Sequence, residues 1–350
     1  MEYRPLGDTG VRASVYSLGS VMFGSWGNND ERECATIINR ALDGGINLID
    51  TADVYSDGQS EQIVGKAIQA RRDEVILATK FHGSMGPGPN DRGNSRLWIM
   101  RAVEASLRRL GTDHIDLYQI HQPDTEMALA ETLAALDDLV TQGKVRYIGS
   151  SNFKAWHLAE AQAVSRERNL VRLVCEQPPY SILVRGIERD VLPVVQRCQM
   201  AAIVWSPLAG GWLAGRYRRD EAPPADSRAG RIEEYQGRGR MVERAHVKNE
   251  ANSAKFDAVE ELAKIAEAAS ISMVSMALAF TLVHPAVTSC LIGPRTPEQL
   301  DSILDGADTC LDEATLDAID NVVPPGAVLN RADAEFDVPS LRLAARRRPR

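Results

Sequence analysis

The chain has 350 residues, of which 44% are hydrophobic and 25% are charged, which is ordinary for a folded globular protein. Its formal net charge of −8 argues against a nucleic-acid-binding surface, because phosphate binding requires a basic stripe. The one basic run, at residues 346–350, is terminal, and we expect a solvated tail there.

The cysteines indicate a reducing environment. There are five of them, an odd number, and none forms a C-x-x-C pair. This pattern predicts free thiols rather than a disulfide framework, and it predicts no metal site. The first residues contain no apolar segment of the signal-peptide type, and no run approaches about 18 apolar residues. We therefore expect a soluble, cytoplasmic protein that binds neither membranes nor nucleic acid.

The chain begins with two short segments, 2–5 and 11–15, which flank Gly7-Asp8-Thr9-Gly10 and predict a β-hairpin. After residue 15, short apolar runs alternate with segments of helical periodicity, which is typical of βα units and a parallel sheet. The eight predicted strands are 16–20, 46–50, 75–80, 115–121, 145–150, 172–176, 201–205 and 288–292.

Eight strands favour an α/β fold closed into a (β/α)8 TIM barrel. An open doubly wound sheet would more often show fewer strands and an early glycine-rich turn. The N-terminal hairpin would then cover the amino-terminal end of the barrel.

We predict a single domain over residues 1–350, with the barrel at about 16–305. Residues 216–254 interrupt the alternation with arginines, glycines and few apolar residues, and they predict a long mobile loop at the carboxyl-terminal face. Residues 83–95, rich in glycine and proline, predict a second loop on that face. Residues 324–350 predict an irregular tail.

Three predicted strands end in reactive side chains. One stops at Asp50, with Tyr55 five positions further on; the others stop at Lys80 and His121. The carboxyl ends of all barrel strands meet at one face, where barrel enzymes place their chemistry. We therefore expect these four residues to converge on one active-site cleft.

Together the four residues suit protonation of an alkoxide as hydride reaches a carbonyl carbon. A tyrosine has an unperturbed pKa of about 10, and a nearby cation lowers it. Lys80 supplies that cation and Asp50 holds it, so we expect a lowered pKa for Tyr55. His121 can polarise a carbonyl oxygen. Taken singly, each residue also has a purely structural interpretation. Asp50 could cap a turn or helix, and Lys80 could be a solvated charge. His121 could be a core histidine, and Tyr55 could simply pack in its loop.

Five motifs run through the chain, at 50–55 (Asp-Thr-Ala-x-x-Tyr), 78–80 (Ala-Thr-Lys), 106–113 (Ser-Leu-x-Arg-Leu-Gly-Thr-Asp), 116–121 (Asp-Leu-Tyr-x-x-His) and 143–153 (Gly-Lys-Val-Arg-x-Ile-Gly-x-Ser-Asn-Phe). They resemble the aldo-keto reductase family, and the resemblance covers most of the chain. It implies the (β/α)8 fold, a catalytic tetrad of Asp50, Tyr55, Lys80 and His121, Tyr55 as proton donor, and NADP(H) as cofactor.

The resemblance also implies residues for the nicotinamide end of the cofactor. Ser151, Asn152 and Gln177 would bind the carboxamide, because amide and hydroxyl groups offer both donors and acceptors. Helix capping is the alternative for the Ser-Asn pair. Trp205 would stack on the nicotinamide ring, with Ser206 beside it.

The phosphates are implied to lie against two loops, at Leu208, Gly210 and Arg216 and at Gly293, Arg295 and Gln299. Glycines let backbone N–H groups approach an anion, and the guanidinium of Arg295 matches a 2′-phosphate, which favours NADPH over NADH. Ser302 and Ile303 replace a Glu-Asn pair of many family members, so we expect fewer contacts with adenine.

The substrate pocket is predicted from Phe23, Trp26 and His82, with core packing as the alternative for the two aromatic residues. The substrate would be a small carbonyl compound or its alcohol. A keto-sugar and an aromatic aldehyde both fit the resemblance, since barrel loops vary with substrate. The oligomeric state is not indicated.

Two functions follow from the sequence. The favoured one is an NADPH-dependent oxidoreductase that reduces aldehydes or ketones to alcohols. The chain also resembles potassium-channel β subunits, which share this barrel and cofactor site, so a nucleotide-binding regulatory subunit is the alternative. The acidic composition of this chain and the absence of an obvious docking segment favour the enzyme over the regulatory subunit.

Overall fold

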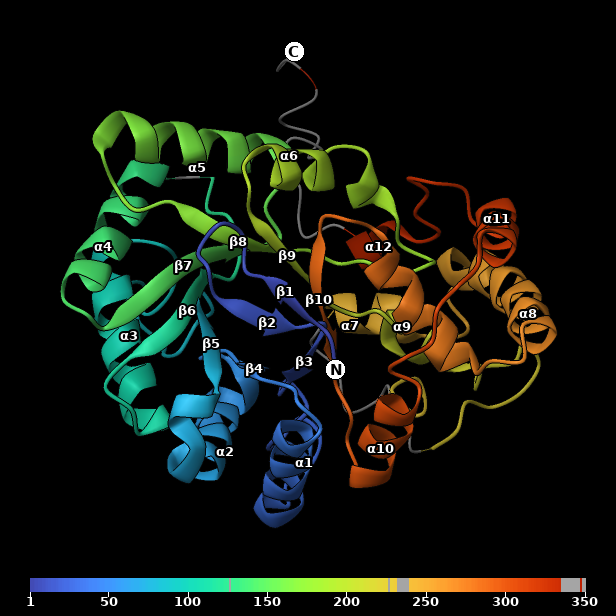
Figure 1. Cartoon of the computed structure of the whole chain (residues 1–350). Helices are drawn as coiled ribbons and strands as arrows, with labels where there is room; N and C mark the ends of the chain where they lie inside the picture. The colour runs from blue at the N-terminus through green and yellow to red at the C-terminus, as the bar shows by residue number, and fades with distance from the viewer. Residues whose placement is uncertain (126, 226, 232–238, 335–346, 348–350) are drawn as a thin grey trace.

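The computed structural model describes residues 1–125, 127–225, 227–231, 239–334 and 347 (Figure 1). Eight parallel strands form a closed barrel in the order β10-β3-β4-β5-β6-β7-β8-β9, which confirms the predicted (β/α)8 fold. The strands are β3 (Tyr16–Gly19), β4 (Leu48–Asp50), β5 (Ile76–Phe81), β6 (Ile115–Ile120), β7 (Val145–Ser151), β8 (Leu173–Gln177), β9 (Ala201–Val204) and β10 (Val287–Ile292).

Side chains that point into the barrel change in character along β5 and β6. In β6, Leu117 belongs to an apolar cluster inside the barrel, and Gln119, two residues later, lies among polar side chains. Ala78 and Lys80 follow the same pattern in β5. Because side chains alternate across a strand with a period of two, the same inward row supplies an apolar floor and a polar upper layer.

The N-terminal hairpin closes the lower end of the barrel, as predicted. Strands β1 (Tyr3–Pro5) and β2 (Arg12–Ser14) are antiparallel and lie across the barrel in Figure 1. Leu6 and Ala13 are fully buried in the interior apolar cluster. Arg4 Nη1 donates to the backbone oxygens of Leu282 and Val287, each at 2.9 Å, and so fastens the hairpin to the end of α9 and the start of β10.

Helices surround the barrel and bury apolar stripes against the strands (Figure 1). In α1, Asp30 caps the N-terminus by accepting from the backbone N–H groups of Arg32 and Glu33, and Ile37 and Ile38 are fully buried. The helices are α1 (Glu31–Asp43), α2 (Gln59–Ile68), α3 (Arg96–Leu110), α4 (Leu129–Thr141), α5 (Ala155–Arg168), α6 (Val191–Arg197), α7 (Gly239–Ala245), α8 (Ser253–Ala268), α9 (Met273–Val283), α10 (Pro297–Asp305), α11 (Glu313–Val322) and α12 (Arg331–Ala334).

Two predicted irregular segments contain regular structure. The segment 216–254 includes α7 and the 3-10 helix Glu250–Asn252, whereas residues 226 and 232–238 lie outside the described residues. The predicted tail includes α12, and its residues 335–346 and 348–350 are likewise outside the described part. Among the described helices, none alone is long and apolar enough to cross a membrane; Glu250–Ala268 and Met273–Val283 reach that length only as a pair bent by 94°.

Candidate active site

The structure brings together the four residues predicted at the strand ends. Lys80 Nζ forms an ion pair with Asp50, donates to the backbone oxygen of Thr51 at 2.9 Å, and lies 3.4 Å from the Tyr55 hydroxyl. The rings of Tyr55 and His121 meet edge to face, with their centroids 5.8 Å apart. An ammonium, a phenol and an imidazole therefore share one site at the carboxyl-terminal face of the barrel.

A tight turn holds Tyr55 in this position. Tyr55 opens the 3-10 helix Tyr55–Gly58 after β4, and its N–H donates to the backbone oxygen of Ala52 at 3.2 Å. Gly58 has a φ of 90°, and a Cβ there would lie 2.6 Å from Arg109 Cδ, so the turn requires glycine. Ser56 Oγ anchors the turn by donating to the backbone oxygen of Phe23 at 3.1 Å.

A second pair of bonds fixes the Asp50 carboxylate. Its Oδ2 accepts from Gln119 Nε2 at 3.0 Å and from Gln177 Nε2 at 2.8 Å. The sequence reasoning missed Gln119, although its place two residues before His121 puts both on the same face of β6. The amide nitrogen of Gln177, expected at the nicotinamide, is used by Asp50 in this structure.

Charge within the site follows from burial and from the Asp50–Lys80 pair. Burial lowers the pKa of Lys80, but the attraction of Asp50 and Tyr55 outweighs it, and the net pKa is raised. Burial, together with the charges of Lys80 and His82, lowers the pKa of His121 well below its ordinary value of 6.5. Lys80 is therefore a cation at neutral pH, and His121 is a neutral imidazole.

The expected acidification of Tyr55 is not found. Burial of the phenol raises its pKa above 10.0, and this desolvation outweighs the lowering influence of Lys80; the Asp50 charge raises the pKa further. The cation beside Tyr55 can be predicted from the sequence, whereas the loss of water around the phenol depends on the folded structure. Tyr55 consequently keeps its proton at neutral pH.

The predicted nicotinamide residues also lie around the site. Asn152 Nδ2 donates to the backbone oxygen of His121 at 3.0 Å and to Ser151 Oγ at 2.9 Å. Ser151 Oγ in turn donates to the backbone oxygen of Gln177 at 2.8 Å. Asn152 Oδ1 is buried with no hydrogen-bond partner among the described residues. A buried acceptor normally has a donor, so this orphaned oxygen fits the amide N–H of a bound nicotinamide.

Trp205 and Ser206 directly follow β9, at the carboxyl-terminal face of the barrel. Trp205 is half-buried, and the guanidinium of Arg244 lies over its ring, 4.9 Å from the centroid. Ser206 adopts a φ of 61° and starts a turn in which its backbone oxygen accepts from the N–H of Ala209 at 2.8 Å. The chain thereby turns sharply into the predicted phosphate loop.

That phosphate loop depends on its glycines. Gly211 has a φ of 102°, and a Cβ there would lie 2.9 Å from the Tyr217 hydroxyl. Leu208 accepts from the N–H of Gly211 at 2.9 Å. The structure also brings Arg228 to this loop, 3.8 Å from the place where a Gly210 side chain would begin. The sequence reasoning named the exposed Arg216 but not Arg228, whose surroundings offered no recognisable motif.

The predicted 2′-phosphate loop lies at the N-terminus of α10. Gln299 Oε1 accepts from the backbone N–H of Arg295 at 2.9 Å, and Asn28 Nδ2 donates to the Arg295 carbonyl at 3.0 Å. A Cβ on Gly293 would meet only the Gly19 oxygen, at 4.0 Å, so the loop is open there. Ile303 is buried in the core.

Of the three predicted pocket residues, Phe23 is corrected. Its side chain is fully buried in the outer core, so the alternative of core packing holds and it does not line a pocket. Trp26 lies beside the tetrad, with its ring centroid 6.1 Å from that of Tyr55. His82 is half-buried and hydrogen-bonded to Asn94.

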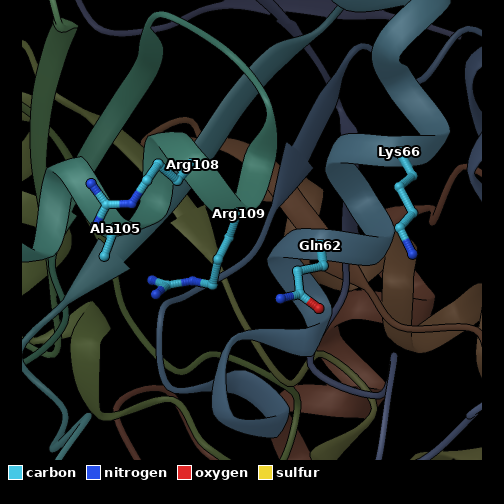
Figure 2. A pocket seen from close by; sticks show the side chains of 5 residues that line it. All are labelled: Gln62, Lys66, Ala105, Arg108 and Arg109. Carbon is cyan, nitrogen blue, oxygen red and sulfur yellow. The ribbon is translucent and has the colours of Figure 1, made fainter.

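A separate pocket of about 350 Å³ lies between α2 and α3 and contains none of the predicted site residues. Figure 2 shows its lining, formed by Gln62, Lys66, Ala105, Arg108 and Arg109. Arg109 is tied to the buried Glu61, with Nε 2.6 Å from the carboxylate, so it has a structural role. Within the described ranges, no three histidine, cysteine or acidic residues form a metal-binding group.

Comparison with known proteins agrees with the fold and the site. A closed (β/α)8 barrel with polar residues at the carboxyl ends of its strands has the face where barrel enzymes place their active sites, and the sequence profile of the aldo/keto reductase family matches residues 17–324. The chain belongs to the aldo/keto reductase family. Members of this family are oxidoreductases that generally use nicotinamide cofactors and act on small carbonyl compounds.

Three relatives are similar over most of their length. An uncharacterized oxidoreductase, YrpG, of Bacillus subtilis is 38% identical over 338 residues, which cover 93% of this chain and 97% of the relative. The aldo-keto reductase YhdN of the same organism is 35% identical, covering 87% and 88%. A probable voltage-gated potassium channel subunit beta of Arabidopsis thaliana is 33% identical, covering 92% and 97%.

Proposed function

We propose that this protein is an NADPH-dependent reductase that converts aldehydes or ketones to alcohols. The observation that carries the proposal is the buried Asp50–Lys80 ion pair beside the Tyr55 hydroxyl, with the His121 ring against the same phenol. These groups surround one place where a carbonyl oxygen can receive both a hydrogen bond and a proton.

Each side chain has a distinct part in this reaction. Tyr55 holds its proton at neutral pH and gives it to the substrate oxygen, while Lys80 stabilises the phenolate that remains. His121, as a neutral imidazole, donates a hydrogen bond to the same oxygen and orients the carbonyl. Asp50 keeps the ammonium in place.

The residues present fit a nicotinamide cofactor, which would supply the hydride when bound. Asn152 Oδ1 would accept from the carboxamide, and Trp205 would support the ring. The turn around Gly210 and Gly211 would bind the pyrophosphate, and Arg295 would pair with a 2′-phosphate. This last contact is the reason we propose NADPH rather than NADH. We also propose that the enzyme works in the cytoplasm, in line with its acidic composition and free cysteines.

The test is a substrate panel with NADPH, followed by the loss of its absorbance, with NADH as the control cofactor. The panel contains keto-sugars and aromatic aldehydes, the two substrate classes that the sequence resemblance suggests. We expect NADPH oxidation with at least one compound and slower oxidation of NADH. A preference for NADH would contradict the role given to Arg295.

The plant relative described as a potassium channel subunit beta favours a second candidate, a nucleotide-binding regulatory subunit. The same experiment separates the two candidates. Tight NADPH binding without reduction of any panel compound, together with co-purification of a membrane protein, would favour the regulatory subunit and contradict the enzyme.

A further inference from the structure

Glu176 is a buried carboxyl group that the proposed reaction does not use. Its neighbours in β8 face the barrel interior, where Cys175 joins the apolar cluster and Gln177 contacts Asp50. Because side chains alternate across a strand, Glu176 points to the outside of the barrel. It is fully buried there, and it cannot touch a substrate in the active-site cleft. A glutamate is rarely buried completely without partners, so its contacts indicate what it does.

The contacts of this carboxyl group go to the turn that follows β7. Glu176 Oε1 accepts from the backbone N–H of Phe153 at 3.0 Å, and Oε2 accepts from Ser150 Oγ. Ser150 and Phe153 flank the two residues Ser151 and Asn152 in the sequence. Because Phe153 is itself buried, loss of Glu176 would leave its N–H without this partner and away from water. The carboxyl group therefore holds the segment 150–153 at both ends.

The turn between these two ends has an unusual shape. Asn152 adopts a φ of 63°, a left-handed conformation that is uncommon for residues with a side chain. Its backbone N–H donates to the oxygen of Gln177 at 3.3 Å, which is a long contact. Helix α5 begins at Ala155 with Lys154 as its N-cap, so neither Ser151 nor Asn152 caps it. The shape of the turn is therefore not explained by the start of α5.

The side chain of Asn152 reaches from this turn into the active site. Its Nδ2 donates to the backbone oxygen of His121 at 3.0 Å and to Ser151 Oγ at 2.9 Å. The His121 carbonyl can only accept, so it is the amide nitrogen of Asn152 that faces it. Oδ1 is left as a buried acceptor with no partner among the described residues. The position of this oxygen depends on the backbone at residue 152, and hence on what holds the turn.

We propose that Glu176 is a positioning residue of the cofactor site: from outside the barrel it holds the turn 150–153 so that Asn152 Oδ1 can accept from the carboxamide of the nicotinamide. This inference rests on the proposed function and adds a residue that acts only through others. A side chain placed behind its ligand-binding neighbours keeps their donors and acceptors in a productive geometry. Glu176 should therefore control how well the site distinguishes a carboxamide from a group that lacks its N–H.

The test compares the binding of NADP+ with that of its 3-acetylpyridine analogue, which carries a methyl group in place of the carboxamide NH2. Isothermal titration calorimetry measures both Kd values without turnover. The analogue leaves Asn152 Oδ1 unpaired, so the wild type should bind it at least about tenfold more weakly than NADP+. Glu176→Leu is similar in size but has no polar atoms. It should reduce this ratio of Kd values at least about fivefold, mainly by weakening the binding of NADP+.

Three further variants isolate the contacts of the carboxyl group. Glu176→Gln keeps an oxygen for the Phe153 N–H and an amide for Ser150 Oγ, so it should restore the wild-type ratio. Glu160→Leu makes the same change at an exposed position of α5 and should also leave the ratio unchanged. Where Glu176→Leu does not fold, as judged by its Tm, Ser150→Ala takes its place. Removal of that one hydroxyl should lower the ratio at least about twofold.

The outcomes separate this inference from the proposed function. A merely structural role would lower Tm and weaken both nucleotides equally, so an unchanged ratio in folded Glu176→Leu, or in Ser150→Ala in its place, would overturn the role of Glu176 alone. Equal binding of NADP+ and the analogue by the wild type would overturn the contact of Asn152, and this inference with it, while the reductase proposal would stand. Failure of the wild type to bind NADP+ at all would overturn the proposed function itself.

Discussion

Glu176 lies beside Gln177 in β8 with its carboxyl group fully buried. It accepts hydrogen bonds from Ser150 Oγ and, at 3.0 Å, from the backbone N–H of Phe153. Burial nevertheless dominates and raises its pKa from 4.5 to about 8. Desolvation thus acts on Glu176 in the same direction as on the Tyr55 phenol, and both groups keep their protons near neutral pH.

The raised pKa of Glu176 predicts how stability changes with pH. Between about pH 5 and 8 the folded state binds a proton that the unfolded state has released, so the free energy of unfolding falls as pH rises. Glu176→Gln should remove this dependence. The free energy of unfolding should then fall between pH 5 and 8 by at least about 2 kcal/mol less than in the wild type. Urea unfolding at pH 5 and at pH 8 measures this difference in the free energy of unfolding. Glu267→Gln is the control, because Glu267 is exposed. Equal losses in wild type and Glu176→Gln would contradict the burial argument.

Sequence reasoning predicted the residues of the site better than their electrostatics. Asp50, Lys80 and His121 could be predicted because each ends an apolar run, and strand ends converge in a barrel. The direction of the Tyr55 pKa shift could not, since desolvation depends on how the turn after β4 buries the phenol. Burial of Phe23 likewise depends on helices that pack from elsewhere in the chain.

At the scale of elements, α7 and α12 form a structural link between the C-terminal segment and Trp205, a residue of the proposed cofactor site. Arg244 in α7 donates to the backbone oxygens of Ala332 and Asp333, at 2.5 and 3.2 Å, while its guanidinium lies over Trp205. Its own carbonyl accepts from Trp212 Nε1 at 3.1 Å. No local pattern predicted α7, because contacts that hold this short helix come from as far as 88 positions away in the sequence.

A buried ion pair reinforces this link. Lys255 Nζ in α8 lies 2.5 Å from the carboxylate of Asp333 in α12, and both side chains are almost fully buried. Burial lowers the pKa of Lys255 and raises that of Asp333, in spite of their mutual attraction. The pair therefore depends on both partners being present, because either charge alone would be buried without compensation.

We expect Asp333→Asn to destabilise the protein by about 3 kcal/mol, since it leaves Lys255 buried and unpaired. Chemical unfolding measures the change. The matched control is Glu261→Gln, which removes one partner of the exposed pair with Lys264 and should have no measurable effect. If Asp333→Asn were as stable as the control, α12 would not be fastened through this pair.

At the scale of the whole molecule, barrel closure creates the site. Asp50 binds Gln177 from 127 positions away in sequence, and the parallel register sets Lys80 directly beside Gln119. The eight apolar runs were sufficient to predict the closed barrel, because each run is a strand of the structure within a few residues. The long connection between β9 and β10 was harder to predict, because its helices carry weak local signals.

The proposed reaction depends on Tyr55 as the proton donor in a site that would also bind NADPH. Tyr55→Phe removes only the hydroxyl and leaves the Asp50–Lys80 pair and the proposed cofactor contacts in place. The most direct measurement is therefore kcat with a reduced panel compound alongside the Kd for NADPH, in wild type and Tyr55→Phe. We predict that kcat falls by about 10²- to 10⁴-fold while the Kd for NADPH changes little. Unchanged turnover in Tyr55→Phe would contradict the assignment.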